Sequence, residues 1–437
     1  MSLFIILMCI VLLVLLITKF KVNTFLAFLI VSILAGLLLG MKITAITSSV
    51  QKGIGDLLGS LVIVIVTGAM LGKLVAESGA AQQITTGMMK LFGTRNIQWA
   101  LMITGFIIGI PLFYNVGFVL VIPLIFSAAY RFNLPVVYIG LPMLASLSVT
   151  HGFLPPHPSP TALVGQFQAD MGKTLVYGFI VAIPTVIIAG PVFAKAIKKI
   201  EARPLETFKP ANLPDDQLPG LTTSILSSLL PVLLLALTTF IAPAMPKEGP
   251  VSDIVRFFSD PDIVMLISLL VATYTLGIRT NMTMGYITTI YGDAVKDISM
   301  ILLIIAGAGA LKNILVDSGI STEIAGLLQN LKMDPLVLGW LIAATIRVCM
   351  GSATVSGLTA AGIVAPAIAG QPVDPNLMVL AIGAGSLMFS HVNDSGFWMF
   401  KEYFNLSIMD TIKSWSLMET IVAIAGLIFV LILNLFI

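Results

Sequence analysis

Long apolar runs alternate with short polar breaks along the whole chain. A run of about 20 apolar residues is long enough to cross a bilayer as a helix. Runs that approach this length lie near residues 1–18, 23–41, 57–76, 173–193, 221–243, 262–278, 297–316 and 415–436. The pattern predicts an all-α polytopic membrane protein, with residues 1–18 as a retained first span rather than a signal peptide.

Two further apolar stretches are broken near their middle by small and polar residues. Residues 97–130 are interrupted at Pro111–Gly117, and residues 336–369 are interrupted at Gly351–Gly357. Each arm is short for a full crossing, and non-helical backbone is tolerated at membrane depth only inside protein or beside water. We therefore expect two re-entrant hairpins with their tips near the middle of the membrane.

Two other stretches, 134–168 and 375–399, carry polar clusters inside apolar sequence. The first is interrupted at Thr150–Pro158, where three prolines cannot sit in an intact helix. The second is interrupted by Ser390–Ser395. Polar groups are costly in hydrocarbon, so both clusters predict broken helices that line a substrate or ion pathway. The alternative is a buried polar network that only holds helices together.

The same polar residues recur 240 positions apart. Thr150-His151 is matched by Ser390-His391, and Glu77-Ser78-Gly79 is matched by Asp317-Ser318-Gly319. The shared histidine is informative because the chain has only 3. We predict a first repeat at 1–194, a cytoplasmic linker at 195–220 rich in proline and charge, and a second repeat at 221–437.

Each repeat is expected to hold five crossings, one re-entrant hairpin and one broken helix. The odd number of crossings inverts the second repeat relative to the first. Inverted repeats with broken helices at matching places are typical of secondary transporters, whose binding site lies near the membrane midplane.

Composition supports a membrane protein and excludes several other classes. The chain is 58% hydrophobic and 10% charged, whereas soluble domains carry roughly 25% charged residues. A net charge of +2 without a basic patch argues against a nucleic-acid partner. Cys9 and Cys349 are far apart and form no CxxC pair, which argues against redox or metal chemistry.

The distribution of Lys and Arg predicts the orientation. With the central linker in the cytoplasm, 14 of the 23 basic residues fall inside, 6 fall outside and 3 lie within spans. Cytoplasmic loops are enriched in Lys and Arg. Both termini should therefore face the periplasm or the exterior.

The four breaks should meet and form the binding site. Helix N-termini there can bind a carboxylate, and unpaired carbonyl groups can hold a cation. The hairpin tips offer neutral hydrogen-bonding groups that suit a polyhydroxylated substrate, and glycines that allow close backbone approach. These residues are Tyr114, Asn115, Gly117, Gly351, Ser352, Thr354, Ser356 and Gly357. The other interpretation is that small residues at the tips only permit tight packing.

Charged and titratable residues at the breaks suggest the coupling chemistry. Arg347 lies one turn before the second tip, where it could bind a substrate carboxylate or form a structural pair with Asp394 or a carbonyl. Asp394 is the preferred proton carrier, because a buried carboxyl group resists ionisation. His151, His157 and His391 are further candidates, as proton carriers or as simple hydrogen-bonding groups. No zinc ligand spacing and no activated nucleophile is visible, so neither a metal site nor an enzyme is predicted.

Three motifs resemble the gluconate permease (gluconate:proton symporter) family. They are Thr150–Pro158, Arg347 with Gly351–Val355, and Ser390–Trp398 followed by Phe400–Leu406. The resemblance covers the whole chain. It implies a bacterial inner-membrane symporter of the ion transporter superfamily, with elevator-type motion and a dimeric assembly. It also implies that Ser352 and Thr354 are hairpin-tip ligands and that His391, Asn393 and Asp394 line the site.

Two positions depart from the family pattern. Members usually carry an acidic residue where this chain has Asn115, and often proline where it has Ser395. If that acid takes part in coupling, coupling here rests on Asp394 or a histidine.

We therefore predict a proton-coupled importer of gluconate or a closely related sugar acid, with no cofactor besides the coupling proton. The carboxylate would meet Arg347 and the tip amides, and the hydroxyls would meet Asn115, Ser352, Thr354, Ser390 and Asn393. Alternatives are a symporter for another small hydroxy acid or D-serine, and a sodium:proton antiporter on the same architecture.

Overall fold

The computed structural model describes residues 2–93, 96–110, 114–155, 157–202, 205, 213–241, 249–320, 323, 333–367 and 373–437. Every regular element in these ranges is a helix, and none of these residues forms a strand, which confirms the all-α prediction. The predicted first hairpin tip lies partly outside the described residues, at 111–113, as does much of the central linker.

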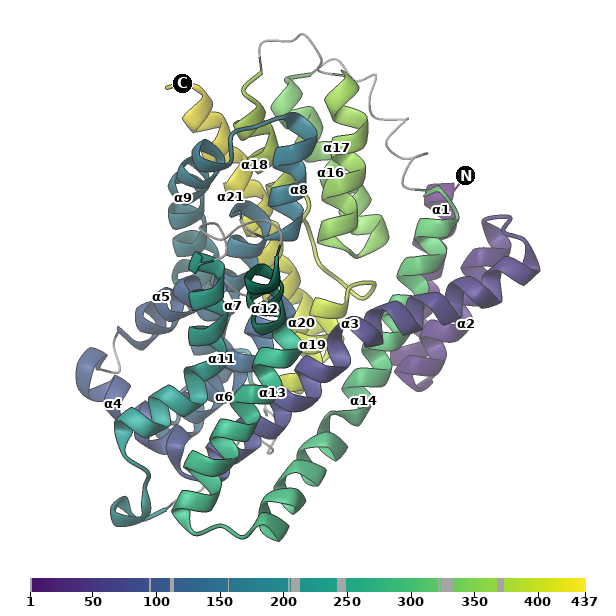
Figure 1. Ribbon diagram of the computed structural model, residues 1–437. Helices are drawn as coiled ribbons and strands as arrows, with labels where there is room; N and C mark the ends of the chain where they lie inside the picture. Colours follow the sequence, from purple (N-terminus) through teal and green to yellow (C-terminus); the bar gives the residue numbers. More distant parts are fainter. Residues whose placement is uncertain are drawn as a thin grey trace.

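The helices follow one another with short connections (Figure 1). In the first half they are α1 (Ser2–Thr18), α2 (Thr24–Leu38), α3 (Ile43–Glu77), α4 (Ala80–Phe92), α5 (Ile97–Gly109), α6 (Tyr114–Phe132), α7 (Val136–Phe153), α8 (Pro158–Phe167), α9 (Met171–Ile187) and α10 (Phe193–Ala196). In the second half they are α11 (Leu221–Ile241), α12 (Pro250–Ser259), α13 (Pro261–Ala272), α14 (Met284–Asp317), α16 (Pro335–Met350), α17 (Ala353–Ala367), α18 (Pro375–Gly385), α19 (Ser395–Tyr403), α20 (Ile408–Thr411) and α21 (Leu417–Asn434).

Six helical segments among the described residues are long and apolar enough to cross a membrane. They are Ile43–Glu77, Val136–Phe167, Met171–Ala196, Pro261–Thr280, Met284–Asp317 and Ile408–Asn434. Shorter apolar helices pack around them. On α2, Leu26, Ile30, Ile33 and Leu37 form an exposed stripe at helical spacing, as contact with lipid requires.

Two predicted spans were too short. The spans expected at 57–76 and 297–316 are parts of α3 and α14, which run for 35 and 34 residues. Polar residues in their N-terminal halves suggested helix ends, but the helices continue because those side chains lie on exposed faces. One of them, Asp297, also pairs with Lys73 across the two helices at 3.4 Å.

The order of elements recurs between the halves. Helices α3 and α14 are about 240 positions apart, and the pairs α5–α6 and α16–α17 follow at the same interval. The interrupted stretches α7–α8 and α18–α19 come next. The first break is narrower than predicted, because Thr150 and His151 still belong to the last turn of α7. The inverted topology and the re-entrance of the two pairs stay predictions.

The two breaks lie against each other. A Cβ atom at Gly383 would collide with the carbonyl oxygen of Gly152, and one at Gly152 would lie 2.5 Å from the side chain of Leu387. Nearby, the Asn376 side-chain oxygen accepts hydrogen bonds from the Asp170 N–H and the Thr174 hydroxyl, both at 2.9 Å. These contacts join residues more than 200 positions apart, so the halves form one core.

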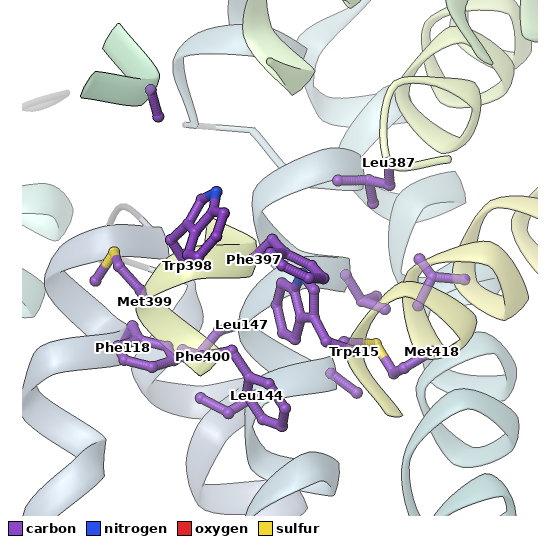
Figure 2. Packing of buried hydrophobic residues seen from close by; sticks show 14 of the residues in the cluster. Phe118, Leu144, Leu147, Leu387, Phe397, Trp398, Met399, Phe400, Trp415 and Met418 are labelled. Atoms are coloured by element: carbon purple, nitrogen blue, oxygen red, sulfur yellow. The ribbon is translucent and has the colours of Figure 1, made fainter. Parts of the chain in front are cut away.

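An aromatic core supports the second break from below (Figure 2). Phe397, Trp398 and Phe400 on α19 are fully buried. The Phe400 ring stacks on Trp415 with 5.4 Å between centroids, and Trp398 meets Phe28 of α2 edge to face at 5.7 Å. Because buried aromatic side chains dominate core energetics, this packing fixes the start of α19 where the polar cluster ends.

Candidate functional site

A cavity of about 370 Å³ lies where both hairpin pairs and both breaks converge. This volume falls in the usual range for small-molecule sites. Its wall includes Leu57, Tyr114, Asn115, Ser148, His151, Pro158, Ala308, Lys312, Arg347, Gly351, Ser352, Ala353, Thr354, Val355, Leu387, Asn393, Asp394, Ser395, Gly396, Trp415 and Glu419. Segments that are distant in the sequence thus meet at one place.

Asp394 begins α19 and is bonded to three donors. Its Oδ1 accepts the Gly396 N–H at 3.1 Å, which caps the helix. Its Oδ2 accepts the Ser390 hydroxyl and forms an ion pair with Arg347 Nη2 at 2.5 Å. A carboxyl group that only accepts hydrogen bonds is ionised, so Arg347 and Asp394 form a buried charge pair.

Trp415 connects this pair to the last span. Its indole N–H donates to the Ser390 hydroxyl at 2.8 Å, and Ser416 donates to the Ser390 carbonyl at 2.5 Å. Tyr114, at the start of α6, packs against the same indole ring at 5.7 Å. The polar break therefore rests on the first hairpin pair and on α21 together.

Two histidines hold the hairpin pairs in place. The His157 ring Nε2 is bonded to the Gly109 carbonyl at the end of α5, and the His391 ring Nε2 to the Val348 carbonyl near the end of α16, each at 2.8 Å. The Asn393 amide donates to Val348 as well, also at 2.8 Å. Both histidines thus satisfy carbonyl groups that a helix end leaves unpaired.

The second tip needs glycine for two reasons. Gly351 has a φ of +70°, which is unfavourable for residues with a side chain. A Cβ atom there would also collide with the Asn393 backbone. The tip therefore lies in backbone contact with the second break, directly on the cavity wall.

Five buried polar atoms on this wall have no hydrogen-bond partner among the described residues. They are Tyr114 Oη, His151 Nδ1, Arg347 Nε, Asn393 Oδ1 and Glu419 Oε2. Buried polar atoms are normally paired, and exceptions need an explanation. Donors and acceptors that converge on one cavity are suited to a polar ligand with several hydroxyl groups.

Comparison with known proteins decides the class of the molecule. The model of the GntP family permease matches residues 1–436. The chain belongs to the GntP family of permeases. It is therefore a multi-pass membrane transporter and not an enzyme.

Close relatives span nearly the whole permease. It is 47% identical to a high-affinity gluconate transporter of Escherichia coli, over 97% of both chains. It is 45% identical to the Gnt-II system L-idonate transporter of the same organism, also over 97% of both chains. It is 44% identical to the gluconate permease of Bacillus subtilis, over 96% of both chains. Among solved structures, the Alcanivorax borkumensis YdaH transporter is 14% identical over 94% of this permease and 98% of that chain, with a TM-score of 0.46.

The predicted site residues divide into two groups. Eight of them lie on the cavity wall: Tyr114, Asn115, His151, Arg347, Ser352, Thr354, Asn393 and Asp394. Five are not among the wall residues: Gly117, His157, Ser356, Ser390 and His391. Of these five, Gly117 is buried in α6, and Ser356 donates to the Ser352 carbonyl at 2.6 Å. The other three hold the tips or Asp394 through the bonds described above.

Four wall residues were not predicted. Lys312 seemed free to reach the membrane surface, and Ser148 and Trp415 carried no distinctive pattern. Glu419 could have been found, because an acidic residue inside an apolar span is a functional candidate by itself. No group of three or more His, Cys, Asp or Glu residues in the described part of the chain could hold a metal ion.

Proposed function

We propose that this permease imports gluconate or a closely related sugar acid together with a proton. The names of the relatives at 44–47% identity support this substrate class, and the L-idonate transporter among them supports a preference for six-carbon sugar acids in general. The observation that carries the proposal is the set of five unpartnered polar atoms around one cavity.

Lys312 and Arg347 are the groups suited to the substrate carboxylate. Lys312 lies on the cavity wall, and its ammonium group makes no ion pair within 4.0 Å in the described part of the chain. Arg347 gives one nitrogen to Asp394, while its Nε–H is unpartnered. Charge-assisted hydrogen bonds from both groups would hold a carboxylate between α14 and α16.

The sugar hydroxyls would meet neutral groups on the opposite side of the cavity. Asn115 and Tyr114 come from the first hairpin pair, and Ser352, Thr354 and Asn393 come from the second tip and break. Each hydroxyl group both donates and accepts, so it can satisfy the unpartnered Tyr114 and Asn393 oxygens. A ligand that lacked these hydroxyls would leave buried polar atoms unpaired, which costs affinity.

Transport requires the cavity to open to each side in turn. We propose inverted repeats with re-entrant hairpins, which would carry the substrate by elevator-type movement in a homodimer. Both termini would face the periplasm. The recurrence of the long helix, helix pair and broken helix in the two halves supports this arrangement.

Proteoliposomes test the proposal. Purified permease should accumulate labelled gluconate when the external pH is lower than the internal pH. Unlabelled sugar acids should compete, while neutral polyols should compete weakly. Absence of accumulation of any sugar acid would refute the proposed function, and a sodium-dependent proton flux without sugar acid would favour an antiporter.

A further inference from the structure

Glu419 is a buried carboxyl group that the mechanism above does not use. It lies near the start of α21 and is only 2% exposed. Its Oε1 accepts the Ser148 hydroxyl of α7 at 2.7 Å, and its Oε2 has no partner among the described residues. Both Glu419 and Ser148 are on the cavity wall. The unpartnered oxygen is therefore within the site that would hold the substrate.

The charged and titratable groups around Glu419 come from five segments. On the cavity wall they are Tyr114 of α6, His151 of α7, Lys312 of α14, Arg347 of α16 and Asp394 at the second break. Helices α9 and α18 also pack against α21. Helix α18 has no titratable residue, and Lys173 and Tyr177 of α9 are not among the wall residues. Asp56 of α3 lies near enough to attract Lys312 but is not a wall residue.

The two carboxyl groups of the cavity have opposite surroundings. Asp394 accepts from Arg347, Ser390 and Gly396, so a proton on it would displace a donor. Glu419 has one donor and one free oxygen, so a proton can be added without breaking a bond. When two carboxyl groups differ in this way, one stays ionised and the other is available as an acid or base.

We propose that Glu419, rather than Asp394, carries the coupled proton; this rests on the proposed function. A proton from cavity water bonds to Oε2 while the cavity faces outward, and it returns to water after the cavity opens inward. Only the O–H bond forms and breaks. Glu419 is neutral during the loaded crossing and ionised during the empty return.

Charge balance links the proton to the substrate. With Arg347, Lys312, Asp394 and Glu419 all ionised, the empty cavity carries two positive and two negative groups. A bound carboxylate adds a negative charge, and protonation of Glu419 removes one. The empty ionised state and the loaded protonated state are therefore both neutral. The other two combinations carry a net charge into the membrane interior, which is costly.

This balance fixes the stoichiometry as one proton for each monoanionic substrate, so transport is electroneutral. An inward gradient of one pH unit should then support an accumulation ratio of about ten, because one pH unit corresponds to a factor of ten. A potassium diffusion potential at equal pH should drive no accumulation. Accumulation by the potential alone would overturn the charge balance.

Glu419→Gln tests the assignment, because glutamine has the shape of the protonated acid. In proteoliposomes with labelled gluconate, the variant should fall from an accumulation ratio of about ten to about one at one pH unit. Exchange of external label for internal gluconate, which needs no net proton movement, should still be detected. Glu402→Gln is the matched control, because Glu402 pairs with Lys401 and is not on the cavity wall. Proton-driven accumulation by Glu419→Gln at the wild-type ratio would overturn the proposal.

Ser148→Ala provides an independent test. Loss of the hydroxyl removes the one hydrogen bond that favours ionised Glu419, so the alkaline midpoint of gluconate binding should move to higher pH by about one unit. An unchanged midpoint, or a move to lower pH, would contradict the role of Glu419. If wild-type protein accumulates no sugar acid, the proposed function fails; if it does and these variants behave like it, only this inference fails.

Discussion

The buried pair between Arg347 and Asp394 can be tested by removing its charges singly and together. The side chains are 5% and 12% exposed, and the charged atoms are 2.5 Å apart. Asp394→Asn keeps an acceptor for the Gly396 N–H but leaves the guanidinium buried without a counter-charge. We expect it to lower the free energy of unfolding by about 3–5 kcal/mol, as when one partner of a buried pair is removed.

Arg347→Met should cost a similar amount, because it leaves the Asp394 carboxylate unpaired. The double variant removes both charges, and neutral replacement of a whole buried pair is often tolerated. Its destabilisation should therefore be smaller than the sum of the single effects by at least about 2 kcal/mol. The matched control is the pair Lys401–Glu402, whose side chains are 18% and 23% exposed. Its coupling should stay below about 1 kcal/mol.

The measurement is denaturant unfolding of purified protein in detergent, followed by tryptophan fluorescence for all variants. Additive single effects, within about 0.5 kcal/mol, would refute the buried pair. Arg347 would then be free to bind the substrate carboxylate by itself, as one of the two sequence-based interpretations proposes.

Three further predictions concern the cavity and the junction of the halves. Lys312→Met should weaken gluconate binding in calorimetry by about 10- to 100-fold, as loss of a charged hydrogen bond does, and should affect a neutral polyol much less; equal losses would exclude a role in carboxylate binding. Gly351→Ala should lower the free energy of unfolding by at least about 1 kcal/mol because of its positive φ, whereas Gly362→Ala, with open space around it, should not; equal stabilities would contradict the tip geometry. Asn376→Leu should cost about 1–3 kcal/mol in the same assay by leaving the Thr174 hydroxyl and the Asp170 N–H unpaired, and wild-type stability would show that this bridge is absent.

Periodicity and polar breaks predicted the helices well where apolar runs end in proline or glycine. The second broken helix is the clearest case, because Ser390–Ser395 cannot be satisfied inside a continuous apolar helix. Helix bounds were wrong where polar residues lie within a helix, as in α3 and α14. There the exposed face of the helix carries the charges, which a linear pattern does not reveal.

The wall of the cavity was predicted in part. Groups at tips and breaks stand out in the sequence, so Arg347, Asn393 and Asp394 were found. The partner of each group could not be deduced, because pairing depends on how distant helices pack. For that reason the sequence favoured Asp394 as proton carrier, whereas its contacts with three donors turn attention to Glu419. Lys312 escaped notice because its distance from the helix end suggested a surface role.

The crossing of α3 and α14 has a consequence for movement (Figure 1). A Cβ atom at Gly53 would collide with the Gly309 carbonyl oxygen, and one at Gly309 with that of Gly53, so the two backbones touch. Leu57, Ala308 and Lys312 lie within one turn of this contact and form one side of the cavity. Helices in such close contact cannot slide past each other without losing it. We therefore expect this side of the cavity to keep its shape throughout the transport cycle, so that the opposite side alone changes its distance from the ammonium group.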